Sequence, residues 1–248
     1  MKHLYFLAIL LFTYFTTFAQ DEIDTDRPDQ TETPSIVPVN RFQMENGFVQ
    51  QQEQKHESDL MFPTALWKFG ISKNLEARLE TDIIYNKFQD STQSGLKPLI
   101  VGLKIKLWDE KGFVPQASLI TQMQIPKLAS KELMVNHLAP EIRFLFQNTL
   151  TENADLGYNL GVNWDGESTA PIYAYTFSPN ISITKKLKAY VEAYGFMPAH
   201  HHSEHWTDGG FMFLITKDVQ LDISAGYEIT SANHYHRYYE SLGVSFRI

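Results

Sequence analysis

Charged residues at every second position are the first feature of this sequence that could do chemistry. Between residues 75 and 85, Glu76, Arg78, Glu80 and Asp82 alternate with mostly apolar residues. Successive side chains of an extended strand point to opposite faces, so these four charged groups would share one face. A face that carries both signs of charge can hold water and ions and can select among dissolved solutes. The pattern predicts a strand with one wet face and one apolar face.

The same alternation recurs along the chain and places further residues on this predicted inner face. The whole set is Glu76, Arg78, Glu80, Asp82, Lys104, Lys106, Glu141, Arg143, Tyr190, Glu192, Tyr194, Asp222 and Glu240. Facing each Arg or Lys toward lipid instead would cost about 2–4 kcal/mol at the bilayer midplane. Two interpretations stay open: an ion-paired interior that only supports the wall, or a selectivity lining. Tyr190, Tyr194 and Phe196 could in addition stack on an aromatic solute.

A second charged group lies in a proline-containing, non-periodic stretch near the N-terminus. Asp24, Asp26, Arg27, Asp29 and Glu32 fall within nine residues of one another. The composition is typical of a solvated linker, and residues 20–40 are predicted as an extended periplasmic segment. The alternative is a segment that folds back into a charged interior or contacts a partner.

Histidines form a third group, because six of the nine fall in two late stretches that are predicted as loops. They are His200, His201, His202, His205, His234 and His236. Imidazole is the commonest metal ligand, so zinc or copper binding is one hypothesis. A solvated polar loop is the other, since the spacing matches no defined zinc motif.

Other chemistry is disfavoured by what the sequence lacks. The chain has no cysteine, which removes disulfides, thiolate metal sites and cysteine nucleophiles. It has no G-x-S-x-G motif and no histidine on its predicted outer face, so an enzyme is not expected. A formal net charge of −8 argues against a nucleic-acid partner, because binding phosphates needs a basic surface.

The elements that would position these groups are twelve predicted strands. Short polar turns and longer loops alternate strictly between them, as in an outer-membrane barrel with periplasmic turns and extracellular loops. The predicted strands are 41–53, 62–71, 75–87, 96–108, 113–125, 138–149, 154–164, 171–183, 187–197, 208–215, 219–229 and 238–248. The facing of 208–215 is left open, because both of its faces are apolar.

Predicted outward aromatic residues gather near the two ends of the strands. Phe69, Trp108, Phe113, Phe146 and Phe246 lie toward the turns, whereas Tyr85, Trp164, Tyr173 and Tyr227 lie toward the loops. Two such bands are typical of membrane interfaces. A soluble β-sandwich also alternates, but it has no reason to place its aromatic residues in two end bands. The predicted fold class is therefore an all-β, antiparallel transmembrane barrel over residues 41–248.

The N-terminal 19 residues predict export. Lys2 and His3 precede a short apolar run that ends in Thr17-Phe18-Ala19, which describes a cleavable signal peptide. An uncleaved anchor is the alternative, but the run is short for a membrane-spanning helix. The expected location is the outer membrane of a Gram-negative bacterium.

The sequence also resembles a known family. Thr25-Asp-Arg-Pro-Asp-Gln-Thr-Glu32 and Phe42-Gln-Met-Glu-Asn-Gly47 are similar to the opening of outer-membrane proteins labelled "putative MetA-pathway of phenol degradation". Weaker matches are Tyr190-Val-Glu-Ala-Tyr-Gly195, Asp208-Gly-Gly210, Gln220 to Gly226 and Gly243-Val-Ser-Phe246. The resemblance implies an outer-membrane barrel with a transport role and supplies no catalytic residues. The closing Ile248 departs from the aromatic residue with which barrel proteins often end.

The expected function is that of a passive, porin-like channel or transporter for small solutes, including aromatic or amphiphilic ones. The alternative is a non-conducting barrel whose histidine-rich loops bind a metal ion or an external partner. The expected partners are outer-membrane lipid, small solutes and the barrel-assembly machinery.

Overall fold

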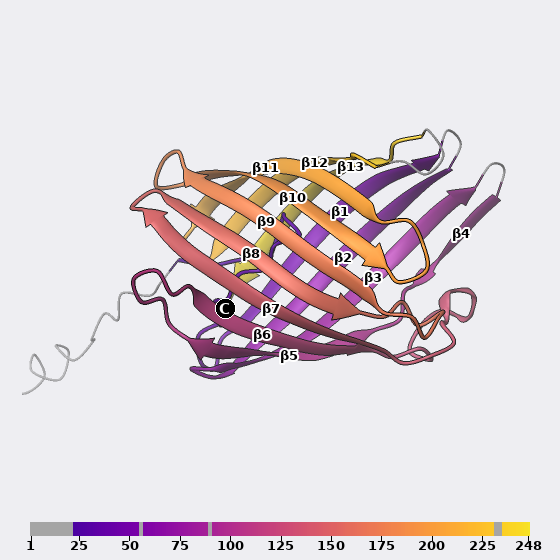
Figure 1. Cartoon of the computed structure of the whole chain (residues 1–248), viewed down its shortest axis with the longest axis horizontal. Coiled ribbons are helices and arrows are strands. Elements are labelled where there is room, and N and C mark those ends of the chain that lie inside the picture. The colour runs from indigo at the N-terminus through magenta and orange to yellow at the C-terminus, as the bar shows by residue number, and fades with distance from the viewer. Residues whose placement is uncertain (1–21, 55–56, 89–90, 231–234) are drawn as a thin grey trace, which may run out of the picture.

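The strands of this chain pair into one antiparallel sheet that closes on itself (Figure 1). The computed structural model describes residues 22–54, 57–88, 91–230 and 235–248. β1 pairs with both β2 and β13, and β2 also pairs with β3, so the ring is closed. The strands are β1 Phe42–Gln54, β2 Glu57–Ser72, β3 Leu75–Phe88, β4 Ser91–Leu96, β5 Ile100–Trp108, β6 Gln116–Gln124, β7 Ala139–Thr151, β8 Ala154–Asn163, β9 Ile172–Ser182, β10 Leu187–Pro198, β11 Glu204–Thr216, β12 Val219–Glu228 and β13 Tyr238–Arg247.

β4 and β5 together occupy one place in this ring. β4 pairs with the later half of β3, where Ile83 lies opposite Leu96, and β5 pairs with the earlier half, where Glu80 lies opposite Ile100. The chain leaves the ladder only at residues 97–99. The barrel therefore has twelve strands around its circumference, which confirms the predicted fold class and strand number.

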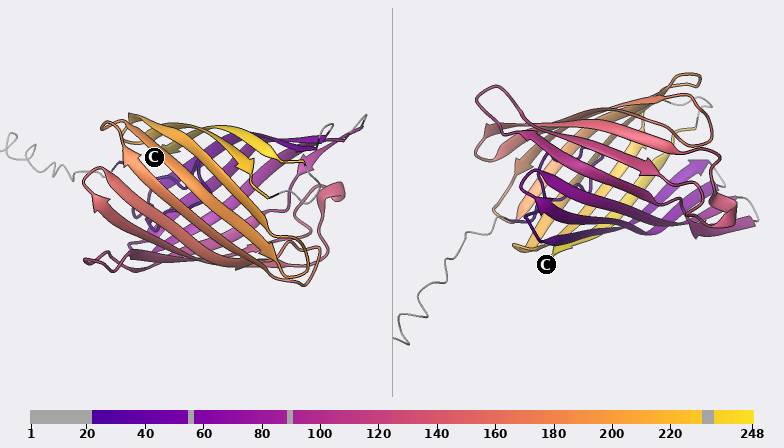
Figure 2. Two further views of the ribbon diagram at one scale, coloured as in Figure 1. Left: turned by 45° about the horizontal axis from the view of Figure 1, so that its top comes forward. Right: turned by 90° about the horizontal axis from the view of Figure 1, so that it is seen from below.

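Short turns lie at one end of the barrel, here called the turn end, and longer connections lie at the other, the loop end (Figure 2). Two predicted loops are wrong, because residues 54–61 and 88–95 are largely strand. β1 and β2 continue as a ladder to Gln54 opposite Glu57, and β3 and β4 to Phe88 opposite Ser91. Backbone pairing needs no apolar alternation beyond the membrane, so these glutamine- and serine-rich ends carry no hydrophobic signal.

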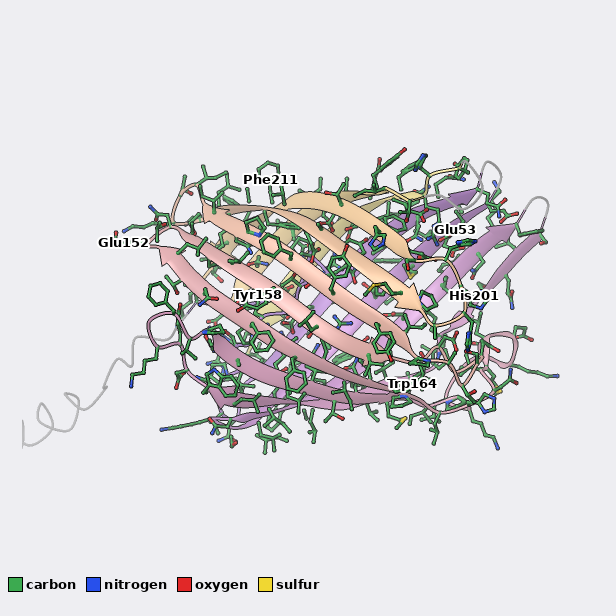
Figure 3. All side chains as sticks on the ribbon, in the orientation of Figure 1. Glu53, Glu152, Tyr158, Trp164, His201 and Phe211 are labelled. Atoms are coloured by element: carbon green, nitrogen blue, oxygen red, sulfur yellow. The ribbon has the colours of Figure 1, made fainter. Side chains whose placement is uncertain are left out.

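The two faces of the wall are the reverse of those of a soluble protein. Large apolar side chains such as Phe144, Phe177 and Ile223 are exposed on the outside, whereas Glu76 and Lys104 are wholly buried inside. Figure 3 shows the outer side chains, with Phe211 and Tyr158 on the wall and Trp164 near the loop end. An apolar exterior around a charged interior suits lipid outside and water inside.

β11, whose facing the sequence pattern leaves open, follows the same rule. Trp206, Asp208 and Met212 are buried inside the barrel, while Phe211 and Phe213 are exposed on its outer face.

Among the described residues, no helix is long and apolar enough to cross a membrane.

Residues 22–40, here called the inner segment, lie within the barrel and not as an extended periplasmic segment (Figures 1 and 2). Its contacts begin at the turn end, where the Ile23 N–H donates to the carbonyl of Lys217 at 2.7 Å. They continue to Val37, whose N–H donates to Glu76 at 2.9 Å. The physical reason is charge: acidic residues of the segment pair with buried cations of the wall, which are costly to leave without enough carboxylates.

Candidate functional site

Asp26 is the electrostatic centre of the inner segment. Its carboxylate lies 2.9 Å from Lys68 of β2, Arg78 of β3 and Lys104 of β5. Burial alone would raise the pKa of Asp26, but the charges of Lys104, Lys68 and Arg78 outweigh it and hold this pKa well below the usual range. Asp26 is therefore an ionised anchor that neutralises cations from three strands.

Glu32 extends this ion network across the barrel. It lies 2.6 Å from Arg78 and 3.8 Å from Arg143 of β7. The amide of Asn159 on β8 binds both backbone groups of Glu32, accepting from its N–H at 2.8 Å and donating to its carbonyl at 3.0 Å. That double contact mimics a strand pairing and fixes the path of the segment.

Arg27 lies on the opposite side of the lumen, where it approaches the backbone of two wall strands closely. Its guanidinium donates to Asp222 at 3.0 Å and to Ser241 at 2.7 Å. Gly47 of β1 and Gly243 of β13 are cross-strand partners, and a Cβ on either would overlap the Arg27 side chain. The two glycines therefore leave the space that the Arg27 side chain occupies.

Glu192 of β10 holds the next residues of the segment. Its carboxylate accepts the Gln30 N–H at 2.8 Å and the Thr31 hydroxyl at 2.5 Å. On the other side of the ring, the Ser118 hydroxyl of β6 donates to the carbonyl of Pro34. The segment is thus hydrogen-bonded to opposite walls of the barrel.

The inner segment separates two cavities of the lumen. A loop-side cavity of about 260 Å³ is lined by the segment and by β1–β3 and β5–β7. A turn-side cavity of about 80 Å³ lies against β7–β12. Asp29 and Glu32 line both cavities. A solute that crosses the lumen must therefore pass this part of the segment.

Aromatic rings fill the lumen beside β10, β11 and β13. Trp206 stacks on Tyr194 with ring centres 6.1 Å apart and lies 6.2 Å from Tyr239, and Phe196 packs against this cluster. Arg237 covers the Trp206 ring at 5.1 Å and is paired with Glu204 and Glu228. The rings cover one another, so they narrow the lumen and present little free surface for stacking on a solute.

The structure places the predicted lumen residues on the inner face, apart from Glu240. Seven of them are buried side chains: Glu76, Arg78, Lys104, Tyr190, Glu192, Tyr194 and Asp222. Four line the loop-side cavity: Glu80, Asp82, Glu141 and Arg143. Lys106 lies at the turn end and pairs with Asp109.

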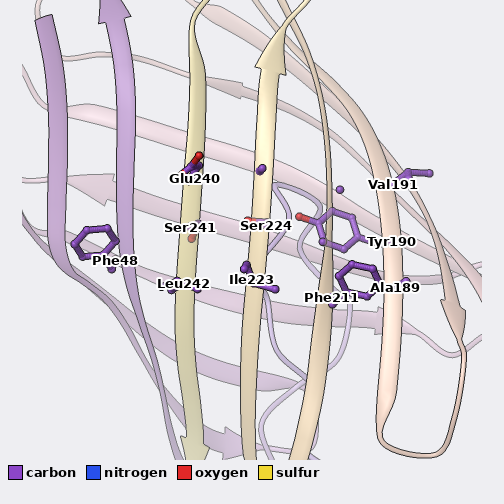
Figure 4. A pocket seen from close by; sticks show the side chains of 13 residues that line it. Phe48, Ala189, Tyr190, Val191, Phe211, Ile223, Ser224, Glu240, Ser241 and Leu242 are labelled. Atoms are coloured by element: carbon purple, nitrogen blue, oxygen red, sulfur yellow. The ribbon is translucent and has the colours of Figure 1, made fainter.

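Glu240 faces outward, which corrects its predicted inner position. Its neighbours Tyr239 and Ser241 are buried inside, whereas Glu240 is exposed and lies opposite Ala225 and Gln50. It contributes to a hollow of about 700 Å³ formed mainly by outer side chains of β10–β13 and β1, such as Phe211 and Leu242 (Figure 4). Glu240 shares its parity with Leu242, Val244 and Phe246, so the alternation of this strand places it outward, and the inward prediction followed only from its charge.

Sequence reasoning missed several inner groups that hold the segment. Lys68 follows the same alternation as its neighbours and could have been found by parity. Gly47 and Gly243 are different, because only the path of Arg27 explains them. Of the N-terminal charged group, Asp26, Arg27 and Glu32 form ion pairs with the wall, Asp29 accepts from Ser178, and Asp24 is exposed.

The histidines do not converge on one site. His205 contacts the hydroxyl of Tyr175 at 2.9 Å, and His236 stacks on Tyr227. His200, His201 and His202 are exposed, and His234 lies outside the described residues. No three His, Cys, Asp or Glu residues of the described chain are close enough to hold a metal ion. The zinc or copper hypothesis has no support from these contacts.

Several solved structures share this fold. The COG4313 outer membrane channel from Pseudomonas putida F1 aligns with a TM-score of 0.67 and 10% identity over 92% of this chain and 100% of that chain. The NanC porin aligns with a TM-score of 0.57 and 10% identity over 83% and 98%. The KdgM porin aligns with a TM-score of 0.55 and 8% identity over 82% and 98%. At these identities the likeness shows the barrel fold alone.

No curated protein matches the sequence. A family model described as "Putative MetA-pathway of phenol degradation" matches residues 25–248, which include residues 25–40 of the inner segment and the whole barrel. This chain therefore belongs to that family of outer-membrane-type barrels.

Proposed function

We propose that this protein is an outer-membrane channel for small polar solutes, with the inner segment as its constriction. The observation that carries the proposal is the charged loop-side cavity that the segment divides from a smaller turn-side cavity. The channel and porin names of the barrels with the same fold support it. A twelve-strand barrel is wide enough for a narrow passage but not for the open pore of larger porins.

The lining of the loop-side cavity favours cations. Its three arginines, Arg27, Arg78 and Arg143, are each within 3.0 Å of a carboxylate. Glu80 has no ion pair among the described residues, and Asp82 has only a distant one, 3.9 Å from Lys97. Carboxylates that remain uncompensated attract cations and repel anions.

Conductance in planar lipid bilayers tests the proposal directly. The refolded protein is expected to give discrete current steps, with a reversal potential in a salt gradient that indicates cation preference. Lys104→Glu and Lys106→Glu variants extend the test, because the ionic selectivity of a lumen pathway must respond to its inner charges. A folded barrel that gives no steps under any condition would contradict the channel proposal.

The remaining parts of the proposal follow from the fold. We infer that the protein is not an enzyme, that lipid covers its apolar wall, and that it reaches the outer membrane by a cleaved signal peptide and the barrel-assembly machinery. The predicted signal peptide, residues 1–19, lies outside the described residues. Edman sequencing or mass spectrometry of the mature protein would identify its first residue, expected to be Gln20.

A further inference from the structure

The two sides of the inner segment meet opposite electrostatic environments. Asp26 faces three cations, as described above. Asp29, three residues later, faces β9 and β10 and accepts the Ser178 hydroxyl at 2.9 Å. Burial raises the pKa of Asp29 well above its ordinary range, and the nearby carboxylates Asp208 and Asp26 raise it further against the opposing effect of Ser178.

Two wall carboxylates share this environment. Glu192 accepts from the backbone of Gln30 and the hydroxyl of Thr31, the two residues that follow Asp29, and it lies opposite Asp208 in the ladder of β10 and β11. Asp208 of β11 accepts the Tyr239 hydroxyl through one oxygen, while its other oxygen is buried without a hydrogen-bond partner. Asp29, Glu192 and Asp208 take part in none of the ion pairs among the described residues.

The remaining described groups around this cluster form no ion pair with it; Arg143 of β7 donates to the Gln30 carbonyl at 3.4 Å but is paired with Glu141 at 2.6 Å. The side chains that β9 and β10 contribute here are hydroxyls and carry no positive charge: Thr176 and Ser178 on β9, and Tyr190 on β10. On β12 and β13, Asp222 is paired with Arg27, and Tyr239 is a neutral hydroxyl. Lys188 of β10 lines the turn-side cavity with Asp29, but it shares that cavity with Asp24 and Asp155.

A proton is the neutralising species that this geometry accommodates. The carboxylates of the described chain do not converge as metal ligands. Like charges at such close quarters cannot all ionise without cost, and interacting carboxyl groups share protons as a unit. Asp29 lines both the turn-side and the loop-side cavity, so this member of the unit lies at the constriction.

We propose that Asp29, Glu192 and Asp208 form a proton-dependent latch that holds the inner segment across the lumen. The inference rests on the proposed channel function. With its proton bound, the cluster keeps residues 29–33 against β9 and β10, and the two cavities stay separate. When pH rises and the proton leaves, repulsion between Asp29 and the two wall carboxylates releases these residues and joins the cavities.

The sign follows from linkage. A group whose pKa is raised in the latched state stabilises that state at low pH, and this contribution is lost as pH rises through the raised pKa. The channel is therefore expected to be closed in acid and to open toward neutral and basic pH. One linked proton changes the ratio of released to latched protein by at most about tenfold per pH unit.

The first readout is bilayer conductance of the full chain between pH 5 and pH 8. Open probability of the wild type is expected to rise by up to about tenfold per pH unit over part of this range. Asp29→Asn and Glu192→Gln imitate the protonated groups and should remove the rise, leaving the channel closed at every pH. Asp59→Asn, a partly buried acid at the loop end of β2, is the matched control and should retain the rise. A rise that persists in both latch variants would overturn the proposal.

The second readout reports the segment without requiring conduction. The chain has no cysteine, so Thr33→Cys introduces a single thiol within residues 29–33, at a partly buried side chain that forms no hydrogen bond with Glu192. The measured quantity is the rate of labelling by a water-soluble maleimide, divided by the rate for an exposed Glu152→Cys control. This ratio is expected to rise with pH, and the rise should disappear when the cysteine variant also carries Glu192→Gln. If labelling rises but no pH gives current, the channel proposal fails and the latch stands. If labelling is flat while current flows, the latch fails and the channel stands.

Discussion

Asp26→Asn is the substitution for which the structure gives the largest expected effect. It removes the charge on which three buried cations converge, each at 2.9 Å. Lys68 keeps Glu45 as a partner, and Arg78 keeps Glu32 and Glu76, so the wall retains part of its compensation. Lys104 loses most, because its next carboxylate, Glu32, is 3.9 Å away. The substitution is therefore expected to weaken mainly the contact between the inner segment and the wall.

The magnitude can be worked from these distances. At an effective dielectric constant of about 20, a unit pair at 2.9 Å attracts with about 5–6 kcal/mol. Desolvation offsets much of this, and removing one partner of a buried pair typically costs about 3–5 kcal/mol in total. Since about 1.4 kcal/mol is a factor of ten, the docked segment should lose roughly a hundredfold or more of its preference over the released state.

Single-channel recording measures this change as a higher open probability, or as steps of higher conductance. Asp24→Asn is the matched control, because it removes the same charge from an exposed residue of the same segment that has no ion pair in the described chain. Heat-modifiable migration on a gel would establish that both variants form the barrel. Equal conductance and equal open probability in Asp26→Asn and Asp24→Asn would refute the anchoring role of Asp26.

Three further predictions concern the wall. Replacing Glu80 by Gln and Asp82 by Asn should lower the cation preference, seen as a reversal potential that moves toward zero, while unitary steps remain. Gly243→Val should displace Arg27 through steric overlap and raise the open probability, and an unchanged open probability would contradict the role given to this glycine. Trp206→Ala removes a ring that is 4% exposed and should destabilise the barrel by about 3–5 kcal/mol, measured by urea unfolding in lipid vesicles.

The sequence by itself determined the features that depend on a local period of two. Alternation in Leu75 to Tyr85 assigned Glu76 and Arg78 to the inner face, because each side chain's facing follows from its neighbours. Strictly alternating turns and loops predicted the ring of twelve strands. The opening motif and its neighbours predicted the family that the match over residues 25–248 shows.

Only the tertiary structure decided which charges meet. Asp26 and Lys104 are 78 residues apart, and their contact exists because the ring closes and brings β2, β3 and β5 around one segment. The same holds for Gly47 and Gly243, whose function is the space they leave for Arg27. The composition of the inner segment is typical of a solvated linker. A polar segment whose groups are hydrogen-bonded by water has the same composition as one whose groups are bound by a buried, charged wall. Choosing between them requires the energy of buried charges, which depends on contacts that no local pattern contains.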